Sequence, residues 1–333
     1  NIAGLIAIAA IVVVMMLSGC TDKEQINTAE VKEELLNSAE IKEMILDSVE
    51  KIDTYKFDID LTEETLIRNE TDETEMTTVS TGKAVVDIAN KMMSMKMTSS
   101  IETPDKAEMP EGPMEMTMNG YFINNTLYRK DGGIPAIPAQ WMKAKIPEGY
   151  DDFWESQNLV NQQVEMLNDS TVELLDDEVV NGVDCYVLKI TPEMEKYGEV
   201  MMMQGGIVYR IIQGLQQNEN FDITKAIKSK SVKQWIAKDT LFPMKTEMQM
   251  KMVINTEDLN LPDTEEAVTV TSDQKTTLVF YDYNKPANIE LPEDAKNASA
   301  FPMFPPMKET TENATEALVF PQMNETEPSA TVA

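Results

Sequence analysis

The sequence contains no histidine. Histidine is the usual general base near neutral pH and the commonest metal ligand, so its absence excludes Ser-His-Asp and Cys-His catalysis and every zinc site built on imidazole. The glycine-rich nucleotide-binding motifs, the G-x-S-x-G motif and the C-x-x-C motif are missing as well. We therefore predict that the protein is not an enzyme and holds neither a metal nor a cofactor.

Cysteine and basic residues are both scarce. The two cysteines are Cys20 and Cys185, and 28 basic residues stand against 58 acidic ones, which gives a net charge of -30. A nucleic-acid-binding protein needs a basic surface to displace counterions, so nucleic acid is excluded as a partner. Cys185 lies in an apolar run and is expected to be a small buried hydrophobic residue.

The amino terminus begins with an uncharged apolar stretch from Ile2 to Leu17. A spanning helix needs roughly 20 residues and the core of a signal peptide about 7–15. The stretch ends in Leu-Ser-Gly-Cys, which resembles the lipobox of secreted lipoproteins, so we predict a signal peptide at 1–19 and lipidation of Cys20. The alternative is an uncleaved membrane helix, and both place the rest of the chain outside the cytoplasmic membrane. Residue 1 is not methionine, and we expect the natural start to lie upstream.

The periodicity of apolar residues predicts an α+β domain at 28–297, after a short tether at 20–27. A repeat over 27–46 predicts one long helix with a joint near Asn37, and helical spacing returns at 151–169 and 193–216. Between these segments apolar and polar residues alternate with period two, which is typical of half-buried antiparallel strands. The predicted strands are 55–67, 75–88, 91–100, 114–123, 126–130, 140–146, 171–180, 183–191, 230–238, 243–254 and 275–284.

The order of these elements resembles the LolA-like superfamily, which includes the lipoprotein carrier LolA and the LppX/LprG-type outer-surface lipoproteins. The likeness spans about residues 41–296. It is carried by "ILDSVEKIDTYKFDIDL", by "VNGVDCYVLKITPE", and by "WIAKDTLFPMKTEMQM" followed by "FYDYNKPANIELPEDA". The resemblance implies a curved, open antiparallel sheet, or half β-barrel, whose concave face is plugged by helices around a cavity for acyl chains.

Three of the predicted strands carry methionine at every second position. Alternate residues of a strand point to one face, and the flexible thioether adapts to varied apolar partners. We predict that these methionines line a cavity for a hydrophobic ligand, and that the helical segment around Gly205 and Gly206 is its lid, with Met201, Met202 and Met203. The cavity residues are Met93, Met95, Met97, Met114, Met116, Met118, Met248, Met250 and Met252.

Two other interpretations of the methionines remain open. They pack beneath the helices in a solid core, as in a structural or sensory surface protein, or they bind Cu(I), which thioethers select. Copper sites usually recruit histidine or cysteine too, so the metal is the least favoured. The preferred hypothesis is a lipid-anchored, non-catalytic cell-surface protein that binds a lipid or an acyl chain and acts with a membrane transporter or an envelope component.

Several further features of the sequence predict what the surface and the tail of the protein contact and where the protein comes from. A lysine-rich stretch at 225–238 contains no acid, and it either forms a strand edge or meets anionic headgroups. Residues 298–333 are rich in Pro, Thr, Glu and Asn, which predicts a disordered tail. Acidity, abundant methionine and glycosylation sequons together favour an anaerobic archaeal source. The sequons begin at Asn69, Asn124, Asn168, Asn297, Asn313 and Asn324.

Overall fold

The computed structural model describes residues 38–103, 113–133, 139–147, 154, 158–168, 170–192, 226–255 and 268–300. The chain divides into two compact units, 1–37 and 38–333, and all described residues belong to the second. They form helices α2 (Ser38–Val49) and α3 (Leu159–Asn168), a short 3-10 helix η5 (Glu293–Asn297) and twelve strands. The strands are β1 (Thr54–Arg68), β2 (Glu73–Asp87), β3 (Met92–Glu102), β4 (Met114–Ile123), β5 (Thr126–Gly132), β6 (Trp141–Lys145), β7 (Ser170–Val180), β8 (Val183–Pro192), β9 (Ile227–Ala237), β10 (Pro243–Asn255), β11 (Thr269–Tyr281) and β12 (Ser299–Ala300).

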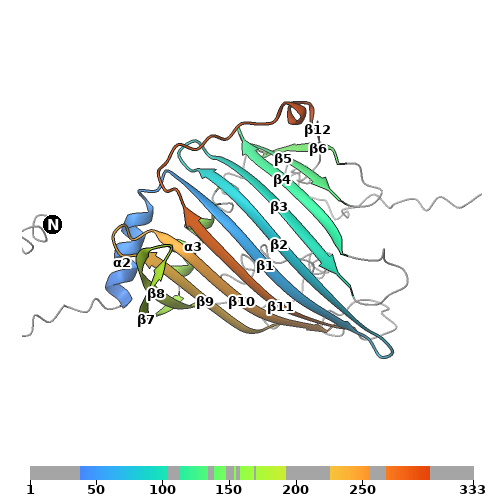
Figure 1. The fold of residues 1–333 in the computed structure, drawn as a ribbon, viewed down its shortest axis with the longest axis horizontal. Coiled ribbons are helices and arrows are strands. Elements are labelled where there is room, and N and C mark those ends of the chain that lie inside the picture. Colours follow the sequence, from blue (N-terminus) through green and yellow to red (C-terminus); the bar gives the residue numbers. More distant parts are fainter. Residues whose placement is uncertain are drawn as a thin grey trace, which may run out of the picture. The chain divides into compact units, whose positions relative to one another are not determined.

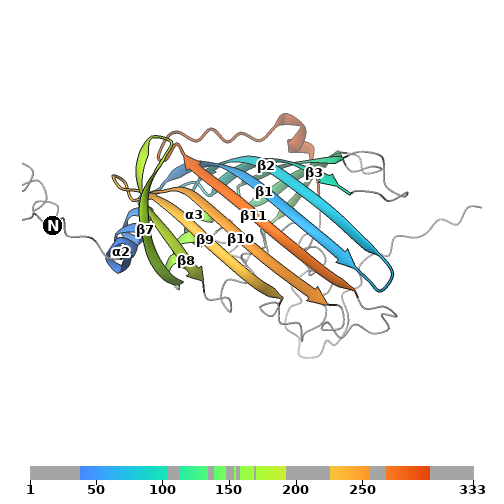
Figure 2. The same cartoon turned by 60° about the horizontal axis from the view of Figure 1, so that its bottom comes forward.

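All twelve strands belong to one curved, open sheet (Figures 1 and 2). Its order is β12-β6-β5-β4-β3-β2-β1-β11-β10-β9-β8-β7, so β12 and β7 are the edges. The pairs are antiparallel except for the short parallel contact of β12 with β6. The predicted fold class, an α+β protein with a curved open antiparallel sheet, is therefore confirmed. Strand β11 lies between β1 and β10, which brings the two ends of the folded segment together at the centre.

An aromatic cluster forms the core at this junction. Phe57 of β1 pairs in register with Phe280 of β11, and their ring centroids lie 6.0 Å apart. Tyr55 lies 6.1 Å from the ring of Phe280, and all three side chains are buried. Alternation accounts for the arrangement, because inward positions two residues apart on neighbouring strands present their rings to the same side.

Both described helices bury one stripe of residues. In α2 the buried positions Ile41, Ile45 and Val49 recur every four residues, as an amphipathic helix requires. The part of the predicted long helix that precedes Ser38 lies outside the described residues. The start of α3 is capped by Asn158, whose Oδ1 accepts hydrogen bonds from the amide of Val160 (3.2 Å) and from the hydroxyl of Tyr55 (3.0 Å).

The lysine-rich β9 is an interior strand, flanked by β10 and β8, so the strand-edge interpretation of this segment was wrong. Two lysines of the lysine-rich stretch form ion pairs with acidic residues of β7. Lys233 Nζ lies 2.7 Å from Glu178 Oε1, and Lys238 pairs with Asp177. The indole of Trp235 donates to the same Glu178 carboxylate (2.9 Å). These contacts involve β7, one of the two edge strands of the sheet. A bulge in β7 between Leu175 and Glu178 accompanies them, as is common at sheet edges.

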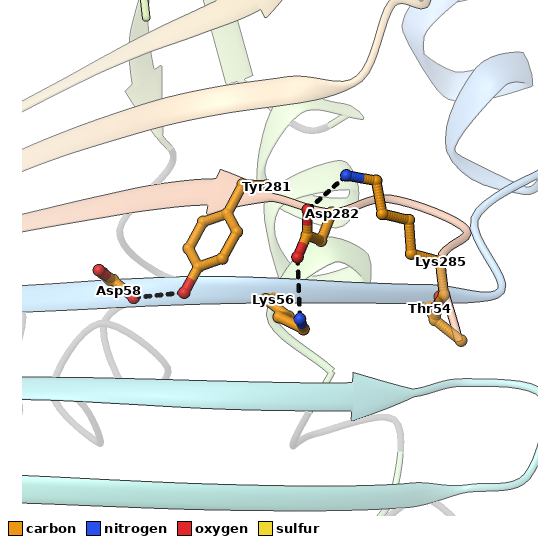
Figure 3. A network of polar contacts seen from close by, with 6 residues as sticks. All are labelled: Thr54, Lys56, Asp58, Tyr281, Asp282 and Lys285. Atoms are coloured by element: carbon orange, nitrogen blue, oxygen red, sulfur yellow. Dashed lines mark hydrogen bonds and ion pairs between the residues drawn. The ribbon is translucent and has the colours of Figure 1, made fainter. Parts of the chain in front are cut away.

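A polar network lies on the side of β1 and β11 that is opposite the aromatic cluster (Figure 3). It joins two of the stretches that carry the family resemblance. Asp282 accepts hydrogen bonds from Lys285 Nζ (2.6 Å) and Lys56 Nζ (2.8 Å). Beside it the hydroxyl of Tyr281 donates to Asp58 (2.7 Å). Burial, followed by the bond to Asp58, raises the pKa of Tyr281 to about 12. The network fastens the end of β11 to the start of β1.

The network predicts a pH dependence of stability. Hydrogen bonds from Lys285 and then Lys56 lower the pKa of Asp282 in the folded state. A lowered carboxyl pKa stabilises the fold above the unfolded pKa, and the stabilisation is lost as the pH falls through the acid range below about 5. We expect Asp282→Asn to narrow the difference between the urea midpoints at neutral and acid pH. Asparagine also tolerates the positive φ of this position.

The control for that experiment is Asp60→Asn, on an exposed position of β1. It is expected to leave the difference between the two urea midpoints as it is in the unsubstituted protein. An equal pH dependence for Asp282→Asn and the unsubstituted protein would show that the network contributes no pH-linked stability.

Candidate functional site

One face of the sheet carries α3, and it is called the inner face below. The side chain of Gln163 on α3 accepts hydrogen bonds from Gln234 of β9 (2.6 Å) and from Thr246 of β10 (3.2 Å). Trp154, which precedes α3, stacks on Phe122 of β4 with a centroid distance of 5.4 Å. The contacts of α3 and of Trp154 therefore fall on strands that are far apart in the sheet but on the same face of it. This shared face defines the inner face.

The six methionines of β3 and β4 lie on this inner face. Met93 pairs in register with Phe122, and Met97 pairs directly with Met118. Residues paired across an antiparallel ladder point to the same side, so the alternate residues Met95, Met114 and Met116 follow them. All six are half-buried. They form the first methionine group, which consists of Met93, Met95, Met97, Met114, Met116 and Met118.

The three methionines of β10 lie on the same face but at a distance. The register runs from Met97 through Gly82, Ile59 and Leu278 to Thr246, and Met248, Met250 and Met252 follow Thr246 at alternate positions. Four strand spacings of about 4.8 Å separate β3 from β10, or about 19 Å. Met250 and Met252 are buried, and Met248 is half-buried. The methionines thus make two groups, and the cavity predicted for them stays a prediction.

A polar band separates the two methionine groups. Its seven side chains are buried on the inner face of the three central strands, where the sequence pattern predicts apolar residues only. The signal was present in the sequence as polar residues at inward positions of an alternating strand. The members are Thr78 and Ser80 of β2, Glu63 and Thr65 of β1, and Ser272, Gln274 and Thr276 of β11.

Charged side chains also lie on the inner face. Arg129 of β5 pairs in register with Gly120, and its Nε donates to Asp131 at 2.8 Å. Lys230 of β9 pairs in register with Met250, and its ammonium donates to the carbonyl oxygen of Pro192. Burial lowers the pKa of Lys230. The inner face therefore combines apolar tracts with a few well-placed polar groups, an arrangement common in binding sites for small amphiphiles.

Several predicted sites fall outside the described residues. They are the lipidation site Cys20, the lid residues Met201, Met202, Met203, Gly205 and Gly206, and the sequons at Asn313 and Asn324. In the described part of the chain, no helix is long and apolar enough to cross a membrane. The same residues hold no group of three or more His, Cys, Asp or Glu side chains that could bind a metal.

Four sequons and the second cysteine can be placed in the structure. Asn124, Asn168 and Asn297 are exposed, whereas the side-chain oxygen of Asn69 accepts a hydrogen bond from the amide of Asp72 (2.6 Å) within a turn. Cys185 is buried beside Val187 and Trp235, and burial raises the pKa of its thiol. Glycosylation at these asparagines stays a prediction.

Comparison with known proteins gives one family match and several distant structures. A family described as one of unknown function, DUF6612, matches residues 33–300, and no curated protein matches. The chain is similar to LprF from Mycobacterium bovis, with 10% identity over 77% of this chain and 98% of that one and a TM-score of 0.38. It is also similar to the Mycobacterium tuberculosis lipoprotein LppX, with 9% identity, coverage of 76% and 100%, and a TM-score of 0.34.

A third solved structure is more distant. A DUF1329 family protein from Desulfovibrio piger shares 13% identity over 77% of this chain and 96% of its own, with a TM-score of 0.24. The solved structures thus include a lipoprotein of the LppX type, the kind of protein that the sequence pattern resembles. At these identities and scores, no ligand, activity or location is transferred from them to this chain.

Proposed function

We propose that this chain, which belongs to the DUF6612 family of unknown function, is a lipid-anchored extracytoplasmic protein. In this proposal it binds a hydrophobic ligand on the inner face of its sheet without catalysis. The lipid anchor is the predicted modification of Cys20, and the partners are the membrane and a transporter or envelope component that delivers or accepts the ligand.

The observation that carries the proposal is the common orientation of the methionines. All nine belong to one face by register, and all except Met250 and Met252 are half-buried. Fully burying one such side chain stabilises the buried state by about 1.5–3 kcal/mol. Half-buried methionines therefore retain apolar surface that a ligand can cover, and their flexibility lets them fit ligands of different shapes.

The geometry favours binding over catalysis. Among the described strand residues, the charged groups of the inner face lie on separate strands: Glu63 on β1, Lys230 on β9, and the Arg129–Asp131 ion pair on β5. Glu63 and Lys230 are separated by three strand spacings, about 14 Å. General acid–base chemistry needs two such groups within hydrogen-bonding reach of the same substrate atoms. The arrangement supports a surface that holds a ligand.

The test is to recover the full-length protein from its own membrane and to weigh it by native mass spectrometry. We expect a co-purified hydrophobic molecule and, after its removal, saturable binding of a fluorescent fatty acid. A protein that carries no ligand and ignores the fluorescent fatty acid would favour the rival, a structural or sensory surface protein with a solid core. Competition with a chromophoric Cu(I) chelator that disappears in Met→Leu variants would favour the copper interpretation instead.

A further inference from the structure

An ion pair lies on the inner face of the sheet, directly beside the first methionine group. Arg129 and Asp131 both belong to β5, and Arg129 Nε donates to Asp131 Oδ1 at 2.8 Å. In the register of β4 with β5, Asp131 is paired with Met118 and Arg129 with Gly120. Because paired residues of an antiparallel ladder share a face, the two charges adjoin half-buried methionines.

The ion pair is open to a ligand and only partly satisfied. The side chains of Arg129 and Asp131 are 48% and 20% exposed, and ion pairs of this exposure add little to the stability of a fold. Their hydrogen bond occupies Nε and Oδ1. Within the described part of the chain, no hydrogen bond involves either Nη atom of Arg129 or Oδ2 of Asp131. The pair therefore offers free donors and a free acceptor at one place.

A notch in the inner face lies between this ion pair and the methionines of β3. Gly120 has no side chain, and a Cβ atom at this position would meet no described atom closer than the carbonyl oxygen of Tyr128, at 4.0 Å. By contrast, Gly82 of the same face has no such space, since a Cβ atom there would lie 2.8 Å from Cγ2 of Ile59. Met95 pairs in register with Gly120 on the other side, so the notch joins the ion pair to the methionines.

We propose that the notch holds the zwitterionic head group of a lipid, with the hydrocarbon chain over the first methionine group. This inference rests on the proposed function and specifies the ligand class. A phosphate or carboxylate of the head group accepts hydrogen bonds from the Nη atoms of Arg129, which suit the oxygens of such anions. An ammonium of the same head group donates to Oδ2 of Asp131.

The charges of the site favour a zwitterionic head group over an anionic or a neutral one. An anion that reaches Arg129 also comes close to the carboxylate of Asp131, in a chain whose net charge is -30, and like charges repel each other. A neutral head group forms no ion pair with either residue. A head group that carries both charges adds no net charge and complements each side chain of the pair.

The test compares three lipids with the same myristoyl chain: lysophosphatidylethanolamine, which is zwitterionic, lysophosphatidic acid, which is anionic, and monoacylglycerol, which is neutral. Each is titrated into the delipidated full-length protein by calorimetry, below its micelle concentration. We expect the zwitterionic lipid to bind about fivefold more tightly than either of the others, the effect of one partly exposed ion pair. Free phosphoethanolamine lacks the chain and is expected not to bind, and binding as tight as that of the lipid would overturn the lipid class.

Single variants assign the preference to the ion pair. Arg129→Gln is expected to give the zwitterionic and neutral lipids about equal affinity, and Asp131→Asn is expected to do the same for the zwitterionic and anionic lipids. The matched controls are Lys189→Gln and Glu173→Gln, which break a 3.0 Å ion pair on the outer face of β8 and β7 and keep the preference. A preference that persists in both inner-face variants would overturn the inference.

A third variant tests the notch itself. Gly120→Val fills it and is expected to weaken the binding of the zwitterionic lipid by about tenfold, because the added methyl groups clash with a head group at that position. Asn119→Val introduces the same side chain on the outer face of β4 and is expected to leave binding unchanged. Unchanged binding to Gly120→Val would show that the head group lies elsewhere and would overturn the inference.

The unsubstituted protein decides the matter even where a variant does not fold. Equal affinities for the three lipids would overturn the role of the ion pair and leave the proposed function standing. Failure of all three lipids and of the fluorescent fatty acid to bind would overturn the proposed function and this inference together.

Discussion

Replacing Phe280 with alanine is expected to lower the free energy of unfolding by about 3–5 kcal/mol, the range for truncating a buried phenylalanine. The ring is 0% exposed. It contacts Phe57 and Tyr55, with centroids 6.0 and 6.1 Å away. These contacts hold β11 against β1 at the centre of the sheet, and the surrounding strands cannot close on the cavity without breaking ladder hydrogen bonds. Urea unfolding followed by circular dichroism measures the change.

The neighbouring residue supplies the control for this measurement. Val279 is half-buried and faces the opposite side of β11, so Val279→Ala is expected to cost clearly less. Similar losses for the two variants would mean that the aromatic cluster is not the centre of the core. A loss for Phe280→Ala below about 1 kcal/mol, the size of a typical surface or methyl deletion, would lead to the same conclusion.

The second large effect concerns ligand binding. Met97 and Met118 face each other across β3 and β4, so the double variant Met97→Asp/Met118→Asp places two carboxylates at one point of the proposed binding face. A ligand that covers them must remove both charges from water, which is strongly unfavourable. We expect the affinity for a fluorescent fatty acid to fall at least tenfold, or about 1.4 kcal/mol. Fluorescence titration measures this change.

Two controls separate a lost binding surface from a damaged fold. Met97→Leu/Met118→Leu keeps the apolar character and the approximate volume, so affinity is expected to stay within a few-fold of the unsubstituted protein. Lys96→Asp/Thr117→Asp also introduces two carboxylates, on the outward side of the same strands, and is expected to leave affinity unchanged. Equal affinity of the Met→Asp variant and the unsubstituted protein would remove the first methionine group from the binding face.

The periodicity of the sequence was sufficient to locate eleven of the twelve described strands, whereas β12 (Ser299–Ala300) lies within the segment that was predicted to be a disordered tail. The strand predicted at 114–123 is β4, Met114–Ile123, and the segment predicted at 55–67 lies within β1. The prediction failed at the start of β11, which begins at Thr269, whereas the predicted strand begins at Lys275. The reason is physical: Ser272 and Gln274 are inward-facing but polar, so the apolar alternation that identifies a half-buried strand is missing there.

The alternation of methionines along each strand also followed from the sequence, because the side-chain period of a strand is two. Their separation into two groups did not, since it depends on the insertion of β11 and the central strands between β10 and β3. The polar band has the same origin. Ser272 and Glu63 are 209 residues apart in the chain and meet only through the pairing of β11 with β1. Local periodicity decides which way a side chain points along its own strand, whereas long-range pairing decides which side chains become its neighbours.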